Sequence, residues 1–353
     1  MIQTDEAVRE RGFLGTMTAL PRFDDGSYLD FIEGLRRYAL TVLNPVAAAA
    51  VRERATTARP ETIESARELA DPIPVVGLRN RILRSTQDMN WNRVVTGYEP
   101  LRPTLEAELA AAERQGPGRL ELVDDWEYPE YYRTVHYHRQ PGGYHEDPLA
   151  GYVYHYGTKV FHLGTNDRDE AKIARAMEVP EPADGRVERV LDIACSIGAM
   201  TVAFKQRWPQ AEVWGIDAAA PLLRYAHARA VRVGGDVIFA QQLAEQLRFA
   251  DASVDVAYLG TLLHEVPHEV AVRIVHEARR VVRPGGVLVV HDMRQAGDPA
   301  DIWEEYDRDF DCRFNGEPYA YHFVHAGFGT LLAELFSSVT TSSGRTVTWV
   351  CVP

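Results

Sequence analysis

The sequence lacks three features: a cysteine framework, a long apolar run and a basic segment. Only three cysteines occur in 353 residues, and the wide spacing of Cys195, Cys312 and Cys351 supports neither a disulfide framework nor a zinc ribbon. No apolar run approaches the roughly 20 residues that span a membrane. The N-terminal sequence MIQTDEAVRERGF carries mixed charges where a secretory signal needs an apolar core. We therefore expect a cytoplasmic protein with no membrane partner.

The charge balance is strongly acidic. The formal net charge is −13, and no lysine- or arginine-rich segment offsets it locally. Such a surface repels phosphate backbones, so we expect no nucleic-acid partner. The apolar content of 46% is sufficient for a large core, and the length favours two domains over one.

The first third of the chain reads as helical. Apolar residues recur at helical spacing in residues 27–43, 77–95 and 101–113, and Pro74 and Pro103 suit the first turn of a helix. We expect residues 1–117 to form an N-terminal helical domain, through which the chain could form a homodimer.

The pattern changes twice after this domain. Residues 118–165 are aromatic and broken by glycine and proline, and we interpret them as an ordered connecting segment. Residues 166–353 alternate amphipathic segments with short apolar runs such as VERVLDI, AEVWGI and SVDVAYL. This alternation predicts a mostly parallel sheet flanked by helices, which is an α/β fold.

Two strand ends in this last part carry a binding signal. In RVLDIACSIGAMTVAF, a buried strand ends at Asp192, and the small residues Ala194, Ser196 and Gly198 precede a helix. A small-residue turn at the carboxyl end of a parallel strand lets backbone N–H groups approach a ligand closely. The next strand, AEVWGID, ends at Asp217, whose carboxylate is placed to accept both hydroxyls of a ribose. Together these features predict a nucleoside site.

The turn fits one class of nucleoside enzyme better than another. Ala194, Ser196 and Ala199 stand where the dinucleotide pattern G-x-G-x-x-G requires glycines. The sequence from Asp192 to Gly198 corresponds instead to D-x-G-x-G-x-G with two glycines replaced. In this form it resembles motif I of the class I S-adenosylmethionine-dependent methyltransferases, in the branch related to ubiquinone/menaquinone-type small-molecule enzymes. The resemblance continues in order through residues 217–230, 241–257 and 262–292 and the final SSVTTSSGRTVTWVCVP. It implies a Rossmann-like methyltransferase fold, a mostly parallel seven-stranded sheet with a C-terminal antiparallel hairpin.

The resemblance also implies a cofactor and the residues around it. The cofactor is S-adenosyl-L-methionine. Many relatives place an aspartate or asparagine where this chain has Leu243, so we expect adenine to be held by backbone N–H near Ala244 and by apolar packing. The predicted cofactor-binding residues are Asp192, Ala194, Ser196, Gly198, Asp217, Ala218, Leu243, Ala244, Tyr154, Tyr156 and Gly260.

The aromatic stretch HYHRQPGGYHEDPLAGYVYHYG (136–157) lies in the segment that covers the methionyl end of the cofactor in the resembled superfamily. Tyr152, Tyr154 and Tyr156 alternate, so in a strand they would share one face. Their rings could contact the sulfonium, a cation. Packing in the core is the alternative for each ring.

The same stretch raises the question of a metal. His136, His138, His145 and His155 match no compact zinc pattern. We therefore expect no metal ion.

Methyl transfer is an in-line displacement that depends on alignment and desolvation. A hydroxyl or ammonium acceptor also needs a base, and His264 and Glu265 follow the fourth strand beside the expected cleft. His138 and Tyr156 are further catalytic candidates. Packing for His264 and a favourable helix-dipole interaction for Glu265 are the alternatives. Residues 301–323 add acids and aromatics that could close the acceptor pocket and favour an amine.

We expect an enzyme that transfers a methyl group from S-adenosylmethionine to an oxygen, nitrogen or carbon nucleophile of a small molecule, in a biosynthetic pathway. Two alternatives stay open. The same fold could use S-adenosylmethionine otherwise, for example by cyclising its methionyl chain. The altered motif I would also suit a non-catalytic binding subunit.

Overall fold

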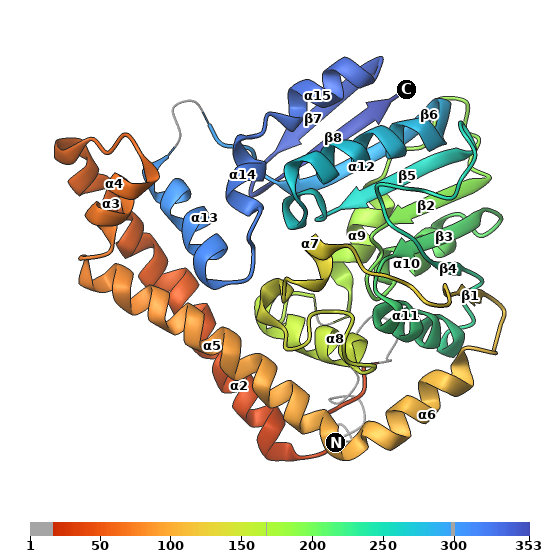
Figure 1. The fold of residues 1–353 in the computed structure, drawn as a ribbon, viewed down its shortest axis with the longest axis horizontal. Helices are drawn as coiled ribbons and strands as arrows, with labels where there is room; N and C mark the ends of the chain where they lie inside the picture. Colours follow the sequence, from red (N-terminus) through yellow and green to blue (C-terminus); the bar gives the residue numbers. More distant parts are fainter. Residues whose placement is uncertain (1–16, 167, 298–300) are drawn as a thin grey trace, which may run out of the picture.

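The computed structural model describes residues 17–166, 168–297 and 301–353, and its centre is one eight-stranded sheet (Figure 1). The strands, in their order across the sheet, are β1 (Arg119–Glu121), β4 (Ile238–Gln241), β3 (Glu212–Asp217), β2 (Arg189–Ile193), β5 (Val254–Gly260), β6 (Val282–Met293), β8 (Thr346–Val352) and β7 (Ser338–Ser343).

The strand directions confirm the predicted fold class. Strands β1 to β6 pair in parallel, and β8 pairs antiparallel with both β6 and β7. The mostly parallel sheet with a C-terminal antiparallel hairpin is thus present. The structure adds β1 to the seven predicted strands, and this strand comes from the connecting segment. Three residues are too few to show a strand period in the sequence.

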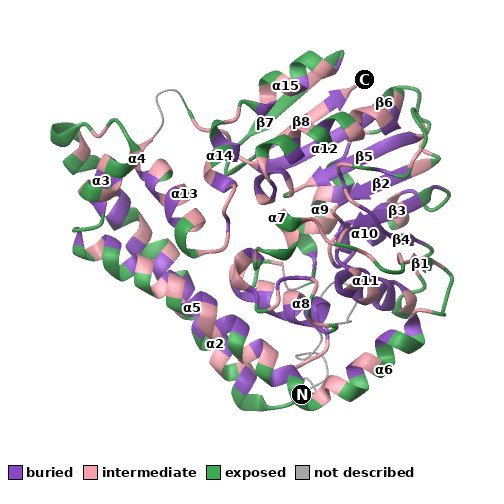
Figure 2. Ribbon diagram, viewed as in Figure 1, coloured by how far each residue is buried: buried purple, intermediate pink, exposed green. Residues whose placement is uncertain are grey.

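The sheet is covered on both faces, as a parallel sheet requires. Alternate residues of β5 point to opposite faces, and almost the whole strand is buried (Figure 2). Val256 and Tyr258 pack in one cluster with residues of α9 (Glu170–Glu178), α10 (Ala199–Arg207) and α11 (Ala220–Arg232). Ala257 and Leu259 pack in the other with residues of α12 (His268–Val281), α14 (Ala320–His325) and α15 (Phe328–Leu335).

The N-terminal part is helical, as predicted. Its elements are α2 (Phe23–Tyr38), η1 (Ala39–Leu43), α3 (Asn44–Ala58), α4 (Ile63–Ala70), α5 (Pro74–Tyr98), η2 (Glu99–Leu101) and α6 (Arg102–Ala112). Pro74 and Pro103 lie in the first turns of α5 and α6. Within the described ranges, no helix combines the length and the apolar character needed to cross a membrane.

One helix from the C-terminal half packs on this helical part. Helix α13 (Ile302–Phe314) lies beside α3 and α4 (Figure 1). Its Trp303 and Tyr306 are buried with Val51 and Val76 in one apolar cluster. Arg52 adds an ion pair of 2.8 Å to Asp301 at the start of the helix. The helical layer therefore includes residues from beyond the boundary predicted at residue 117.

The connecting segment contains short helices, including one over the tyrosines that would share a face in a strand. It forms α7 (Glu130–Arg133), η3 (Tyr137–Arg139) and α8 (Ala150–Phe161). In a helix, residues two apart point in nearly opposite directions and residues four apart share a face, so Tyr154 points away from Tyr152 and Tyr156. The face that all three would share in a strand is therefore absent.

The sequence offers no clear sign of this helix because α8 is buried on most of its surface, where the polar residues His155 and Lys159 are buried together with the apolar ones. Gly157 allows this burial, because a Cβ atom there would lie 2.0 Å from Cζ3 of Trp91. Gly151 allows a similar approach, with a Cβ 2.3 Å from that of Tyr225.

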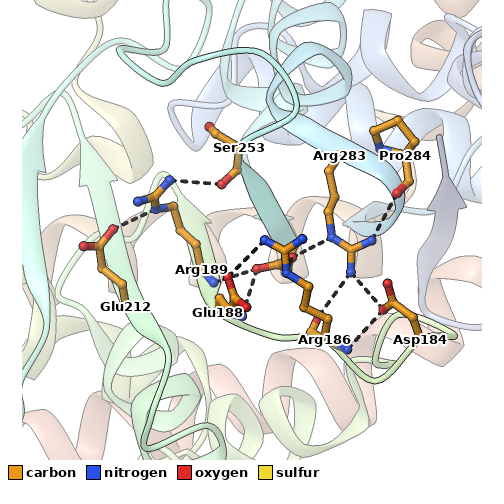
Figure 3. A network of polar contacts seen from close by, with 9 residues as sticks. Asp184, Arg186, Glu188, Arg189, Glu212, Ser253, Arg283 and Pro284 are labelled. Carbon is orange, nitrogen blue, oxygen red and sulfur yellow. Dashed lines mark hydrogen bonds and ion pairs between the residues drawn. The ribbon is translucent and has the colours of Figure 1, made fainter.

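A polar network fixes the amino ends of the central strands. Asp255 Oδ2 accepts hydrogen bonds of 2.8 Å from the backbone N–H groups of Glu188 and Arg189, and its Oδ1 accepts one of 2.6 Å from Arg283. Arg283 also pairs with Asp184 (Figure 3). Burial raises the pKa of Asp255, but these donors outweigh it and hold the pKa below its ordinary value. The opposite, carboxyl edge of the sheet is therefore the edge available to a ligand.

Candidate active site

The turn after β2 has the backbone of a glycine-rich loop although two of its glycines are replaced. Ala194, Ser196 and Gly198 have φ values of 60°, 51° and 74°, all in the left-handed region. This conformation costs an L-residue roughly 1–2 kcal/mol and a glycine almost nothing. The positions that resemble motif I glycines are thus the positions where the turn needs them.

Asp217 at the end of β3 is tied to this turn. Its Oδ2 accepts a hydrogen bond of 2.9 Å from Ser196 N, and its Oδ1 accepts one of 2.9 Å from Ala219 N. Burial raises the pKa of Asp217 to about 6, and these two donors offset the rise only in part. Further donors would therefore stabilise the carboxylate, and ribose hydroxyls are such donors.

Asp192 has a different surrounding. Its Oδ2 accepts a hydrogen bond of 2.7 Å from Thr201 Oγ1, and burial raises its pKa to about 7. It lines a small cavity of about 80 Å³, together with Lys172. Ala194 and Ser196 line both this cavity and the larger one described next, so the two adjoin.

The larger cavity, of about 420 Å³, lies at the carboxyl edge of the sheet. This size falls within the range of small-molecule sites, roughly 300–1,000 Å³. Of the predicted cofactor-binding residues, those that line it are Ala194, Ser196, Asp217, Ala218, Leu243, Ala244, Tyr154 and Gly260.

Gly198 and Tyr156 do not line the cavity. Gly198 faces the core, where a Cβ atom would lie 2.6 Å from Cζ of Phe239. Tyr156 is buried in an apolar cluster and meets Tyr98 edge-on, with 6.2 Å between ring centroids. Cofactor contact by these two residues, and a catalytic role for Tyr156, stay predictions that their positions outside the cavity lining do not support.

Tyrosines form one wall of the cavity. Tyr154 meets Tyr144 edge-on at 5.4 Å, and Tyr131 and Tyr132 of α7 complete the wall. The Tyr131 hydroxyl donates a hydrogen bond of 2.5 Å to Glu245. We did not predict Tyr131, Tyr132 or Tyr144, although the aromatic composition of the segment was the available signal.

A polar cluster lies in the same cavity. The predicted residues His138, His264 and Glu265 come together there with Glu317, which was not predicted. His138 contacts Glu317 Oε1 through Nδ1 at 2.6 Å and Glu265 Oε1 through Nε2 at 3.1 Å. His264 contacts Asp292 Oδ1 through Nδ1 at 2.5 Å. Its Nε2 lies 4.0 Å from Glu265 Oε1 and 3.8 Å from Glu317 Oε2.

The electrostatics of the cluster favour positive charge. Burial lowers the pKa of both imidazoles, but the neighbouring carboxylates outweigh it. The pKa of His138 is held well above its ordinary value by Glu317 and Glu265, and that of His264 is raised to about 9, mainly by Asp292. Burial raises the pKa of Glu317, and His138 and His264 bring it below its ordinary value. The cluster is an arrangement of mutually stabilised opposite charges.

The four histidines of the aromatic stretch do not converge. His138 lines the cavity, whereas half-exposed His136 lies 3.8 Å from Glu146. His145 packs on the ring of Tyr128 at 4.7 Å, and His155 Nδ1 contacts the hydroxyl of buried Tyr225 at 2.7 Å. These four residues therefore do not form one site.

The comparison with known families agrees with this geometry. Residues 190–286 match the family model described as a methyltransferase domain. This range begins in β2 and includes the turn after it, Asp217, the loop after β4 and the residues that follow β5. Residues 190–286 are a methyltransferase domain.

Curated proteins similar to this methyltransferase domain act on different acceptors. The chain is 33% identical over 112 residues to a ubiquinone/menaquinone biosynthesis C-methyltransferase of Bdellovibrio bacteriovorus, an alignment of 32% of this chain and 47% of the relative. It is 33% identical over 122 residues to a malonyl-[acyl-carrier protein] O-methyltransferase of Xylella fastidiosa, covering 33% and 38%. The chain thus spans less than half the length of these relatives.

Among solved structures, an O-methyltransferase family protein from Burkholderia thailandensis has 15% sequence identity and a TM-score of 0.49, over 88% of this chain and 93% of that one.

The cofactor of this methyltransferase domain is S-adenosylmethionine, and the side chains around the cavity suit it. Asp217 offers an acceptor to a ribose, and Ser196 Oγ is buried without a hydrogen-bond partner among the described residues. Leu243 and Ala244 offer apolar surface beside it. The ring of Tyr154 offers a π face suited to a cation.

Proposed function

We propose that the protein transfers a methyl group from S-adenosylmethionine to a small molecule bound in the 420 Å³ cavity. The observation that carries the proposal is that Asp217 and the polar cluster of His138, His264, Glu265 and Glu317 line the same cavity. A cavity that holds the nucleoside of the cofactor at one end and the acceptor at the other can align the two for an in-line displacement.

In this proposal, each part of the cavity has one task. Bound S-adenosylmethionine supplies an activated methyl group on a sulfonium. Asp217 accepts hydrogen bonds from the ribose hydroxyls, and Leu243 and Ala244 flank the adenine. The Tyr154 ring and its tyrosine neighbours exclude water, which would otherwise solvate the sulfonium and the nucleophile.

The polar cluster serves the acceptor. Glu265 has a carboxylate oxygen between the two imidazoles, 3.1 Å from His138 and 4.0 Å from His264. It is placed to take the proton that a hydroxyl or amine acceptor releases. His138 and His264 hold this carboxylate in position. The sequence prediction named His264 with Glu265 as candidates for the base and His138 as a further candidate, and the present proposal assigns the proton to Glu265.

The turn geometry argues against a non-catalytic binding subunit. That alternative rested on the two replaced glycines, yet Ala194 and Ser196 adopt the left-handed backbone of the glycines they replace. Intramolecular cyclisation of the cofactor would leave the polar cluster without an acceptor, so methyl transfer is favoured over it.

The acceptor class follows from the cavity walls. The tyrosine wall suits a planar or apolar body, and the cluster suits one hydroxyl, enol or amine group. By name, the relatives mentioned above are a ubiquinone/menaquinone biosynthesis C-methyltransferase and a malonyl-[acyl-carrier protein] O-methyltransferase. A biosynthetic small molecule of this kind is our proposed substrate.

The test uses the full chain incubated with S-adenosylmethionine, with and without a pool of small metabolites. Formation of adenosylhomocysteine together with a metabolite heavier by one methylene group would support methyl transfer. Methylthioadenosine formed without the pool would instead indicate cyclisation. Glu265→Gln should abolish the transfer, and His145→Ala, outside the cavity, should leave it unchanged.

The homodimer and the cytoplasmic location stay predictions. Exposed apolar side chains occur on the helical part, and they are Phe23, Phe31, Tyr38, Val42, Val46 and Leu78. Sedimentation analysis of the purified chain would test the dimer.

A further inference from the structure

We propose that His138, His264 and Glu265, with Glu317 beside them, form a binding site for one divalent transition-metal ion in the wall of the cavity. The ligand atoms of His138, Glu265 and Glu317 lie within 4.8 Å of one another. His264 Nε2 lies 4.0 Å from Glu265 Oε1 and 3.8 Å from Glu317 Oε2. Atoms that share one ion at roughly 2.0–2.2 Å lie at most about 4.4 Å apart, so small side-chain movements would bring these groups around an ion.

The imidazole of His264 is oriented in the manner of a metal ligand. Its Nδ1 is hydrogen-bonded to Asp292 Oδ1 at 2.5 Å. This fixes the tautomer of His264 and leaves its Nε2 facing Glu265 Oε1 at 4.0 Å. Metal-bound histidines almost always donate their other N–H to such a partner. Asp292 does not line the cavity, which suits an orienting role.

Glu317 provides an independent observation. Its side chain is 8% exposed and it lines the cavity, yet its Oε2 has no hydrogen-bond partner among the described residues. A buried carboxylate oxygen without a donor is costly. An ion held by the neighbouring side chains would satisfy it.

The charge of the cluster fits a divalent cation. Glu265 and Glu317 bring two carboxylates close together beside His138, and neutral imidazoles would leave their charge without compensation. A divalent cation between these two carboxylates supplies two positive charges. The two imidazoles favour a first-row ion such as Mn²⁺, Fe²⁺, Co²⁺ or Zn²⁺ over Mg²⁺ or Ca²⁺, which prefer oxygen ligands.

This inference departs from the expectation that the chain binds no metal. That expectation considered four histidines of one stretch, and only His138 belongs to the present set. The other groups come from the loop after β5, from β6 and from the segment after α13. The inference deepens the proposed function and rests on it for one point only, the ion's task of orienting an oxygen or nitrogen of the acceptor. Glu265 would bind the ion through Oε1, which faces both imidazoles, and take the acceptor's proton through its other carboxylate oxygen.

The test is titration of the chelator-treated full chain with Zn²⁺, Co²⁺ and Mg²⁺ by calorimetry, without S-adenosylmethionine. We expect one Zn²⁺ or Co²⁺ per chain, visible absorption bands from bound Co²⁺, and much weaker binding of Mg²⁺. Glu317→Gln, which keeps the shape of the side chain, should weaken Zn²⁺ by at least about 10-fold, and His264→Ala by more. His145→Ala is the matched control and should bind as the wild type does.

Several results would overturn the site. One is the absence of stoichiometric binding by the wild type. Another is an adventitious ion only. Such an ion would bind Glu317→Gln and His264→Ala as tightly as it binds the wild type. If His264→Ala does not fold, as judged by circular dichroism, Glu317→Gln still decides the question. If the wild-type chain binds Zn²⁺ but transfers no methyl group, the proposed function is refuted and the metal site is not. Methyl transfer unaffected by the chelator would refute the ion's task.

Discussion

Replacing Asp217 by asparagine should separate cofactor binding from folding. The carboxylate accepts two backbone hydrogen bonds and is placed to accept the ribose hydroxyls as well. Losing the negative charge weakens the ribose hydrogen bonds, each worth roughly 1.5–3 kcal/mol when charge-assisted. We expect Asp217→Asn to lose about 2–3 kcal/mol of S-adenosylmethionine affinity, which corresponds to roughly 30- to 150-fold.

The effect on stability should be small because two contributions oppose each other. The rise of the Asp217 pKa from its ordinary 3.8 to about 6 corresponds to about 3 kcal/mol of unfavourable ionisation, and asparagine removes it. The new amide group, however, presents N–H donors to Ser196 N or Ala219 N, and an unsatisfied donor costs about 1–3 kcal/mol. The unfolding temperature should therefore change by only a few degrees.

Calorimetry at pH 8 with S-adenosylmethionine and adenosylhomocysteine is the assay, together with thermal unfolding. The control is Asp236→Asn. Asp236 precedes β4, at the amino ends of the strands and away from the cavity, and it is ion-paired with Lys205 at 3.7 Å. Folded Asp217→Asn that binds both ligands like the wild type would refute the assignment of the ribose site.

Three further predictions follow from the same geometry. Ala194→Gly and Ser196→Gly should each stabilise the protein by about 0.5–1 kcal/mol in urea unfolding, because relief of left-handed strain exceeds the added entropy of the unfolded chain; a loss of stability would contradict this. Adenosylhomocysteine affinity should fall as the pH drops below about 6, because protonated Asp217 accepts ribose hydroxyls poorly; the same fall in Asp217→Asn would show another cause. Tyr154→Leu should weaken the binding of S-adenosylmethionine more than that of adenosylhomocysteine, by on the order of 1 kcal/mol. Tyr156→Leu should only lower the thermal stability. The reverse pattern would place Tyr156 at the sulfonium.

The parallel strands could be predicted from the sequence because each is a short buried apolar run. The run RVLDI ends at the turn around Ala194, and AEVWGID ends at an acid, so both the strands and the acid proposed to bind the ribose were visible locally. The hairpin at the C-terminus was visible for the same reason, as two runs joined by a short turn.

The rest depended on packing between distant segments. Helix α8 was not recognised because its polar and apolar residues are buried alike and its alternating tyrosines resemble a strand pattern. Glu317 belongs to a segment whose acids were noticed, but nothing in the chain places it against His138. Asp292 ends a buried strand, and only the fold reveals that His264 donates to it.

The structure of a complex with adenosylhomocysteine tests the central claim most directly. The account predicts ribose hydroxyls on Asp217, adenine against Leu243 and Ala244, and the sulfur facing Tyr154 in the cavity that also holds Glu265. A ligand bound outside this cavity, or one whose ribose does not contact Asp217, would contradict it.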